Sequence, residues 1–308
     1  MSLVIYYAYL DIRDPFVAWE VAIGRLCSAD NLENEGLFSL STRQFSFFRR
    51  YSRAGIVTPQ IKNENRLEKI RFERYCKLPS RLRGVFVFDN KADAESAAIR
   101  WDVSHFDSRY LAEIEMIPDR KVRLDSEWIT SNLLADREDV WMDRYWRGEV
   151  YGERPLTEVI CSGVGRVLNT DLRKRAYESI MAMFPRAVPL LSMACIAYNL
   201  GFNRAAQIVP YLIREGEMVK GVHVLNMNDF NEGSQFFNAF TQYNGPRPPL
   251  AIPWDGVILR PDLSANWFYL SDADLFQLVG ESPPTSPTSQ PSLERLRQAH
   301  DTKTNIDP

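Results

Sequence analysis

The sequence predicts an α+β protein, because segments with strand character and segments with helical character both occur along its 308 residues. Residues 4–10 and 84–88 are short β-branched and aromatic runs, which favour strands. Residues 16–26 and 92–101 instead carry apolar side chains at helical spacing. A Gly-x-Gly pair occurs at 163–165, but no third glycine follows at the spacing of a dinucleotide-binding motif, which argues against a Rossmann sheet.

The composition is that of an ordinary globular protein, with 45% hydrophobic and 25% charged residues. The length suits about two domains and is enough to bury a real core. The formal net charge of −3 gives the whole molecule no strong electrostatic attraction to nucleic acid or to a membrane.

Cysteine and histidine usage argues against a metal site. The four cysteines lie far apart without metal-ligand spacing, which predicts reduced thiols in a cytosolic protein. The three histidines are not paired at ligand spacing, so we expect neither a zinc site nor a histidine-centred catalytic triad. No metal is therefore expected.

The N-terminal region has no pattern of a signal peptide, because Asp11, Arg13 and Asp14 interrupt any apolar core. No run of about 18 apolar residues occurs, so we expect no membrane-spanning segment. The expected location is a cytoplasm, either that of the producing cell or that of a target cell.

Residues 43–83 form a basic segment that is interleaved with aromatic residues. It contains twelve arginines and lysines against three glutamates, a net charge of +9. Positive charge beside stacking surfaces suits an anionic partner, either the phosphates of a dinucleotide or single-stranded RNA. The alternative is a solvated helical face over 62–77, in which the glutamates pair with basic neighbours and the aromatic residues belong to the core.

The stretch 80–101 organises the first half of the chain, because it predicts a strand, a polar turn and an Ala-rich helix in direct succession. The other elements expected before residue 185 are a strand at 110–117, a helix at 128–143, two strands at 156–161 and 163–168 that pair with each other, and a helix from Asp171 to Met183.

Pro185 and Pro189 interrupt the chain and mark the expected boundary between a domain at 1–184 and a smaller mixed α/β domain at 185–280. The proline- and serine-rich residues 281–308 predict a disordered tail. Within the second domain we expect helices at 190–200, 203–215 and 229–240, a strand at 222–227, and a hairpin of 254–260 with 267–270.

The order of these pieces resembles the ADP-ribosyltransferase-like superfamily, whose members cleave NAD at its nicotinamide bond. The stretch PSRLRGVFVFDNKADAESAA at 79–98, followed by Tyr145-Trp146 and by PLTEVI at 155–160, looks like a poorly characterised bacterial group assigned to that superfamily. The resemblance covers about residues 4–168. It implies a split mixed and antiparallel sheet with flanking helices.

The resemblance also implies that Glu158 is the catalytic carboxylate. Cleavage of the nicotinamide–ribose bond develops oxocarbenium character, which a neighbouring carboxylate stabilises. Glu158 is an isolated acid in an apolar run, and strand alternation directs it to one face of the sheet. The alternative is a solvent-facing glutamate near the start of a strand.

The same resemblance implies an NAD cleft lined by Tyr7, Ser80, Arg81, Arg83 and Phe88. Tyr7 stands on the first strand, where the superfamily usually has a His or Arg that grips a ribose. Ser80 precedes the middle strand, Phe88 offers a ring to stack on nicotinamide, and the two arginines would hold the pyrophosphate. The alternatives are core packing for the ring and solvated strand-edge charges for the arginines.

The activity that the resemblance implies is mono-ADP-ribosyl transfer from NAD, as substrate, to a macromolecular acceptor, either protein or RNA. Bacterial and phage proteins of this kind often act as toxins, effectors or defence components, with an antitoxin or chaperone partner as a further option. The alternative is a non-catalytic nucleotide- or nucleic-acid-binding module, which the lack of a His or Arg on the first strand favours. A third hypothesis is simple nucleic-acid binding through the basic segment.

Overall fold

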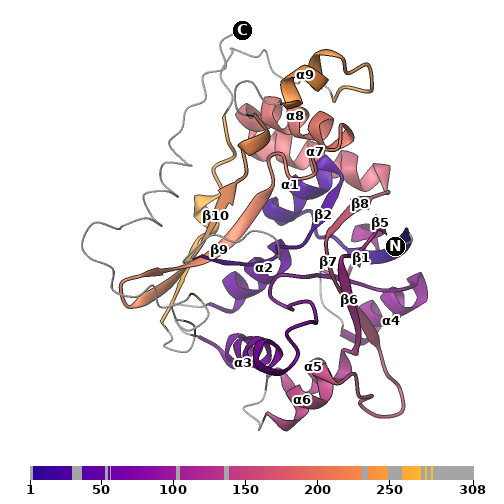
Figure 1. Ribbon diagram of the computed structural model, residues 1–308, viewed down its shortest axis with the longest axis vertical. Coiled ribbons are helices and arrows are strands. Elements are labelled where there is room, and N and C mark those ends of the chain that lie inside the picture. Colours follow the sequence, from indigo (N-terminus) through magenta and orange to yellow (C-terminus); the bar gives the residue numbers. More distant parts are fainter. Residues whose placement is uncertain are drawn as a thin grey trace.

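The computed structural model describes residues 3–29, 37–52, 55, 57–101, 105–134, 139–230, 235–248, 259–271, 275 and 279. Within these ranges the chain is mixed α+β, with antiparallel sheets and helices packed around them (Figure 1). The predicted tail at 281–308 lies outside the described residues.

The first sheet contains the N-terminal strand and has the order β1-β5-β8-β2, with every neighbouring pair antiparallel. Its core-facing side carries the fully buried Tyr6 of β1 and Ile114 of β5, which lie opposite each other in the ladder. The strands are β1 (Val4–Tyr9), β5 (Leu111–Met116), β8 (Val164–Val167) and β2 (Arg25–Cys27).

The second sheet has the order β4-β7-β6 and is also antiparallel; its strands are Val85–Val87, Thr157–Ser162 and Arg120–Asp125. An isolated bridge between Tyr7 and Phe88 places the end of β4 beside β1, which brings the two sheets together. Gly84 permits the close approach at the start of β4, because a Cβ there would lie 2.6 Å from the Ser80 carbonyl oxygen and 2.7 Å from Ile160 Cγ2.

The third sheet is dominated by the long hairpin of β9 (Ile208–Glu215) and β10 (Met218–Leu225), which runs diagonally in Figure 1. Its order is β11-β10-β9-β3, where β11 is Phe268–Leu270 and β3 is Phe38–Ser39. The main apolar core therefore contains side chains from both halves of the chain, among them Tyr6 and Leu212.

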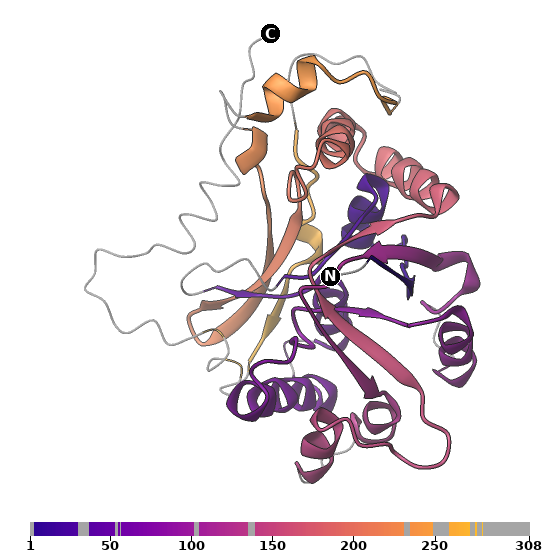
Figure 2. The same ribbon diagram turned by 45° about the vertical axis from the view of Figure 1, so that its right-hand side comes forward.

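Helix α1 has a side-chain cap at its N-terminus and a glycine at its C-terminus. Asp14 caps α1 by accepting a hydrogen bond from the Phe16 amide at 2.9 Å, and Gly24 ends it with φ 96°. The helices are α1 (Pro15–Ile23), α2 (Thr42–Tyr51), α3 (Pro59–Arg74), α4 (Lys91–Trp101), α5 (Glu127–Asn132), α6 (Val140–Trp146), α7 (Thr170–Met183), α8 (Val188–Asn199) and α9 (Gln235–Thr241), with 3₁₀ turns at Ser108–Tyr110, Pro185–Ala187, Asn228–Phe230 and Ser264–Asn266. Figure 2 shows α7 and α8 at one end of the molecule, and α3, α5 and α6 at the other.

Most elements predicted for the first half are confirmed, including the strand–turn–helix unit formed by β4 and α4. Three predictions are wrong. Residues 208–215 form strand β9 instead of a helix, because their apolar side chains are buried on both faces of a paired ladder. Strand β8 pairs with β5 and β2 instead of β7, since Gly163 turns the chain with φ 128°. The helix expected at 128–143 is two helices. Strand β11 pairs with β10, and residues 254–258 of the hairpin expected with 267–270 lie outside the described residues.

Among the residues described, no single helix is long and apolar enough to cross a membrane. Only when Thr170–Met183 and Pro185–Asn199 are counted as one segment do they reach the length and apolar composition of a membrane span, and they are bent by 119° at their junction.

Candidate functional site

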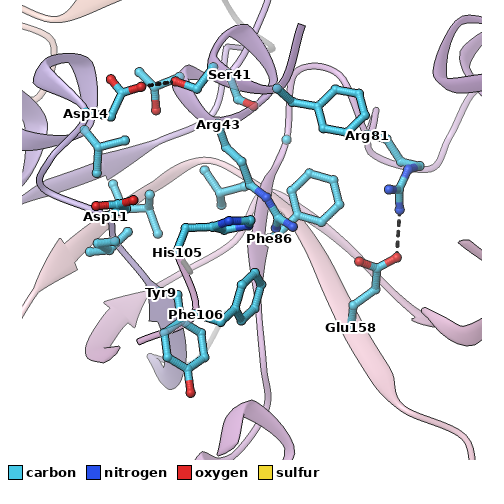
Figure 3. A pocket seen from close by; sticks show the side chains of 18 of the residues that line it. Tyr9, Asp11, Asp14, Ser41, Arg43, Arg81, Phe86, His105, Phe106 and Glu158 are labelled. Atoms are coloured by element: carbon cyan, nitrogen blue, oxygen red, sulfur yellow. Dashed lines mark hydrogen bonds and ion pairs between the residues drawn. The ribbon is translucent and has the colours of Figure 1, made fainter. Parts of the chain in front are cut away.

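A cavity of about 270 Å³ lies where the end of β1, helix α2, strand β4 and the start of β7 come together. Figure 3 shows side chains from these elements converging on it. Its lining combines seven aromatic side chains with a group of charged ones. The charged groups include Arg43, Arg81 and Glu158, and the aromatic residues are Tyr9, Phe47, Tyr51, Phe86, Phe88, Trp101 and Phe106.

Glu158 enters this cavity from β7, but its carboxylate is held by neighbouring side chains. Arg81 Nη1 donates to Glu158 Oε1 at 2.7 Å, and the Tyr145 hydroxyl donates to the same oxygen at 2.8 Å. Arg81 also forms a fork with Glu64, at 2.9 Å and 3.1 Å. Both bonds of Glu158 use Oε1, and within the described part of the chain Oε2 accepts none. The side chain is therefore oriented while one oxygen remains available to a ligand.

The protonation states in this network follow from burial and charge. Burial alone would lower the pKa of Arg81, but the charges of Glu64 and Glu158 and the hydrogen bonds to Glu64 raise it well above its ordinary value. Burial raises the pKa of Tyr145 well above its ordinary value as well. Arg81 therefore stays cationic and Tyr145 stays a hydrogen-bond donor at neutral pH.

Arg43, on the first turn of α2, projects into the middle of the cavity. Its guanidinium lies over the Phe86 ring at 4.2 Å from the centroid, and 5.9 Å from that of Phe106. Arg43 is exposed to solvent, but the protein around its guanidinium removes part of the water that would otherwise hydrate it. This desolvation lowers the pKa of Arg43 to about 10, with the charge of Arg81 acting in the same direction.

His105 lies beside Arg43 in the cavity wall (Figure 3). Its Nδ1 is 3.4 Å from Nη1 of Arg50, which also lines the cavity. Partial burial, together with the positive charges of Arg43 and Arg50, lowers the pKa of His105 to about 4. The imidazole is therefore neutral at pH 7.

The aromatic residues form a continuous wall on one side of the cavity. Phe106 is 4.7 Å from Tyr9 and 4.9 Å from Trp101, centroid to centroid, and Trp101 is 6.0 Å from Phe88. Such a wall suits a planar ring, because aromatic faces attract one another in tilted and offset arrangements. The cavity therefore offers an apolar side for a ring and a charged side for polar groups.

Of the six site residues predicted from the sequence, Glu158, Arg81 and Phe88 line this cavity. Tyr7 does not: its backbone pairs with Phe88, and its side chain packs against the aromatic cluster of Phe88 and Phe106 without lining the cavity itself. Ser80 is buried and donates to Glu68 Oε2 at 2.9 Å. That hydroxyl also accepts from two backbone amides of its own loop, so Ser80 shapes the entry to β4.

Arg83 lies in a different place from the other predicted residues. It faces a wider groove of about 960 Å³ along α3, where its guanidinium lies 4.5 Å from the Phe38 ring centroid. Three of the cations lining that groove are paired with carboxylates: Arg71 with Glu68, Arg74 with Asp143 and Arg66 with Asp139. Most of the positive charge in that groove is therefore already paired with protein carboxylates.

Sequence reasoning missed Arg43, His105, Phe106 and Tyr145. Arg43 belongs to the basic segment, but nothing in that segment distinguishes it from its eleven basic neighbours. His105 and Phe106 follow α4 and are close to Arg43 only through the fold. Within the described ranges, no group of three or more His, Cys, Asp or Glu side chains is placed to hold a metal ion.

Comparison with known proteins identifies no family model that matches the chain, and no curated protein is similar enough to it to count as a relative.

Proposed function

We propose that this protein is an ADP-ribosyltransferase that uses NAD as substrate and modifies a macromolecular acceptor, either a protein or an RNA. The supporting observation is that Glu158, from the motif at 155–160, lines one cavity together with Arg81 and Phe88, from the motif at 79–98. A toxin, effector or defence role, with an antitoxin or chaperone partner, belongs to the same proposal.

In this proposal Glu158 is the catalytic carboxylate. Cleavage of the nicotinamide–ribose bond places positive charge on the ribose, and the Oε2 oxygen of Glu158 stabilises that charge. Arg81 and Tyr145 act as positioning residues, because their bonds to Oε1 fix the carboxylate before the substrate arrives. Arg81 thus supports the carboxylate and does not itself grip the pyrophosphate.

NAD is compatible with the residues present. The aromatic wall offers a face for a planar ring, and Arg43 offers a cation for the pyrophosphate. The cavity is slightly smaller than the roughly 300–1,000 Å³ that is typical of ligand sites, so only part of the dinucleotide would be enclosed. The remainder would lie at the mouth, where an acceptor can approach.

The second candidate is a nucleotide-binding module without turnover. The observation that favours it is the burial of Glu158, which is only 4% exposed and is bonded to two neighbours. The position of Tyr7 outside the cavity lining agrees with this alternative, since no first-strand side chain expected to grip a ribose reaches the site.

Release of labelled nicotinamide from NAD separates the two candidates. The wild type, Glu158→Gln and the control Glu178→Gln, on the exposed side of α7, are each incubated with NAD, with and without cell extract or RNA. We expect release from the wild type and the control, and at least a hundredfold slower release from Glu158→Gln. No release from any of the three refutes turnover. Release that survives Glu158→Gln refutes the site assignment.

A further inference from the structure

We infer that Arg43, with His105 and Arg50 beside it, is the phosphate subsite of the cavity, and that the cavity takes a nucleoside phosphate whose base lies on the aromatic wall. Only the assignment of this phosphate to NAD rests on the proposed function. The cation that would bind the phosphate is Arg43 of α2, which lies outside every motif that the sequence resemblance selected.

Six guanidinium groups surround the cavity against five carboxylates, counting Glu64, which shares Arg81 with Glu158, so one positive charge is in excess. Each carboxylate in its lining already has a cationic partner. The pairs are Asp11 with Arg13 at 2.8 Å, Asp14 with Arg49 at 3.0 Å, Glu20 with Arg25 at 2.5 Å, and Glu158 with Arg81 at 2.7 Å. Two further guanidinium groups of the lining, Arg43 and Arg50, have no carboxylate within ion-pair distance among the described residues.

Arg43 is oriented to receive an anion. Stacking on Phe86 occupies one face of the guanidinium and leaves its N–H edges free, because within the described residues they donate to no oxygen. The planar fork of an arginine matches two oxygens of a phosphate. A partly desolvated cation is costly. The charges of Glu158 and Glu64, which both pair with Arg81, offset that cost only in part, and the lowered pKa of Arg43 reflects the remaining cost. A bound anion would remove it.

His105 adds a neutral donor next to this cation. The Arg50 guanidinium can only donate, so His105 Nδ1 is the acceptor in their 3.4 Å contact. The imidazole proton is then on Nε2, which is available to donate to a ligand oxygen. Arg43 and His105 together therefore offer a charged fork and a neutral N–H to one phosphate.

The surroundings favour a nucleotide over a simple anion. The aromatic wall of Tyr9, Phe88, Trp101 and Phe106 begins next to the Arg43 guanidinium, which is 5.9 Å from the Phe106 centroid. A ligand that carries both a planar ring and a phosphate fills both sides of the cavity, whereas inorganic phosphate uses only one.

Calorimetric titration of the full chain with ADP, adenosine and inorganic phosphate tests this assignment. Arg43→Gln should weaken ADP binding by roughly tenfold to a hundredfold, the range expected when a charge-assisted hydrogen bond is removed. Adenosine binding should change by less than about threefold, since it places no phosphate at Arg43. Arg109→Gln, which removes an exposed arginine outside the cavity, serves as the charge-matched control and should leave both affinities unchanged.

Measurements on the wild type alone provide a second test that does not depend on a folded variant. ADP should bind more tightly than both adenosine and inorganic phosphate, and its affinity should fall as salt rises. The subsite is refuted if ADP and adenosine bind equally, if ADP does not bind, or if Arg43→Gln folds and still binds ADP within about threefold of the wild type.

The same titrations separate this inference from the proposed function. Arg43-dependent ADP binding in a protein that releases no nicotinamide supports the subsite and refutes turnover. Glu158-dependent turnover with an unchanged KM for NAD in Arg43→Gln supports turnover and refutes the subsite.

Discussion

Replacement of Arg81 by methionine should destabilise the protein by about 4 kcal/mol. Arg81 is the common cation of two carboxylates, with four donated hydrogen bonds between 2.5 and 3.1 Å to Glu64, Glu158 and Tyr145. The side chains of Arg81, Glu64 and Glu158 are only 2 to 5% exposed. Methionine retains much of the apolar stem but leaves both carboxylates buried without their cation.

The magnitude follows from the cost of breaking a buried ion pair by removing one partner, which is about 3–5 kcal/mol. The nearby charge of Arg43 offsets part of that cost for Glu158, so we do not expect a value above this range. Glu158→Gln should cost only about 1–2 kcal/mol, because Gln still accepts from Arg81 and Tyr145 and Glu64 still balances the cation. A triple variant in which Arg81, Glu64 and Glu158 are all replaced by neutral residues should be more stable than Arg81→Met alone.

Urea unfolding followed by tryptophan fluorescence at pH 7.5 measures these differences. With a slope of about 3 kcal/mol per molar urea, Arg81→Met should lower the midpoint by about 1.3 M. A shift below about 0.3 M, or a smaller shift than that of Glu158→Gln, contradicts the geometry, because it means that Arg81 is not enclosed by the two carboxylates.

Three further predictions follow from single residues. The pKa of His105 is about 4 in the folded chain and about 6.5 in the unfolded chain, so the unfolded chain binds the proton first as pH falls. After allowance for partial exposure, the free energy of unfolding should fall by about 2 kcal/mol between pH 6.5 and pH 4. The His105→Gln variant should not show this loss in urea unfolding. Burial raises the pKa of Cys161 to about 12, so mass spectrometry after brief alkylation at pH 8 should find exposed Cys76 modified and Cys161 intact. Gly84→Ala should cost about 1–3 kcal/mol in urea unfolding, since its Cβ would lie 2.6 Å from the Ser80 carbonyl oxygen; an unchanged midpoint would contradict the packing at β4.

Local signals were enough to predict several elements of the first half, among them strand β4 and helix α4, which each carry their pattern within a few neighbouring residues. They failed at 208–215, where a helix was expected after Gly201. This segment pairs with β10, which follows it directly in a hairpin, and with β3, which lies far away in the sequence. Tertiary pairing therefore overrode a weak local preference.

The candidate site was only partly predictable for a related reason. The resemblance selected Arg81 and Glu158, but their contact joins positions 77 residues apart, and no spacing rule gives it. Arg81 was expected to hold a pyrophosphate. The fold instead surrounds it with Glu64, Glu158 and Tyr145, so its charge is already committed to protein groups. A resemblance can name a residue in a motif without stating which partner the fold provides.

The basic segment shows why a count of charges cannot identify a binding site. Its net charge of +9 suggested an anionic partner, either the phosphates of a dinucleotide or single-stranded RNA, yet Arg66, Arg71, Arg74 and Arg81 all form ion pairs with carboxylates. Paired charges are largely cancelled at the distance of a phosphate, so unpaired ones govern affinity. Arg43 is such a charge, and it lies inside a cavity instead of on an open face. The arrangement therefore favours a small nucleotide over a polymer, a distinction that depends on where each carboxylate lies in the folded chain.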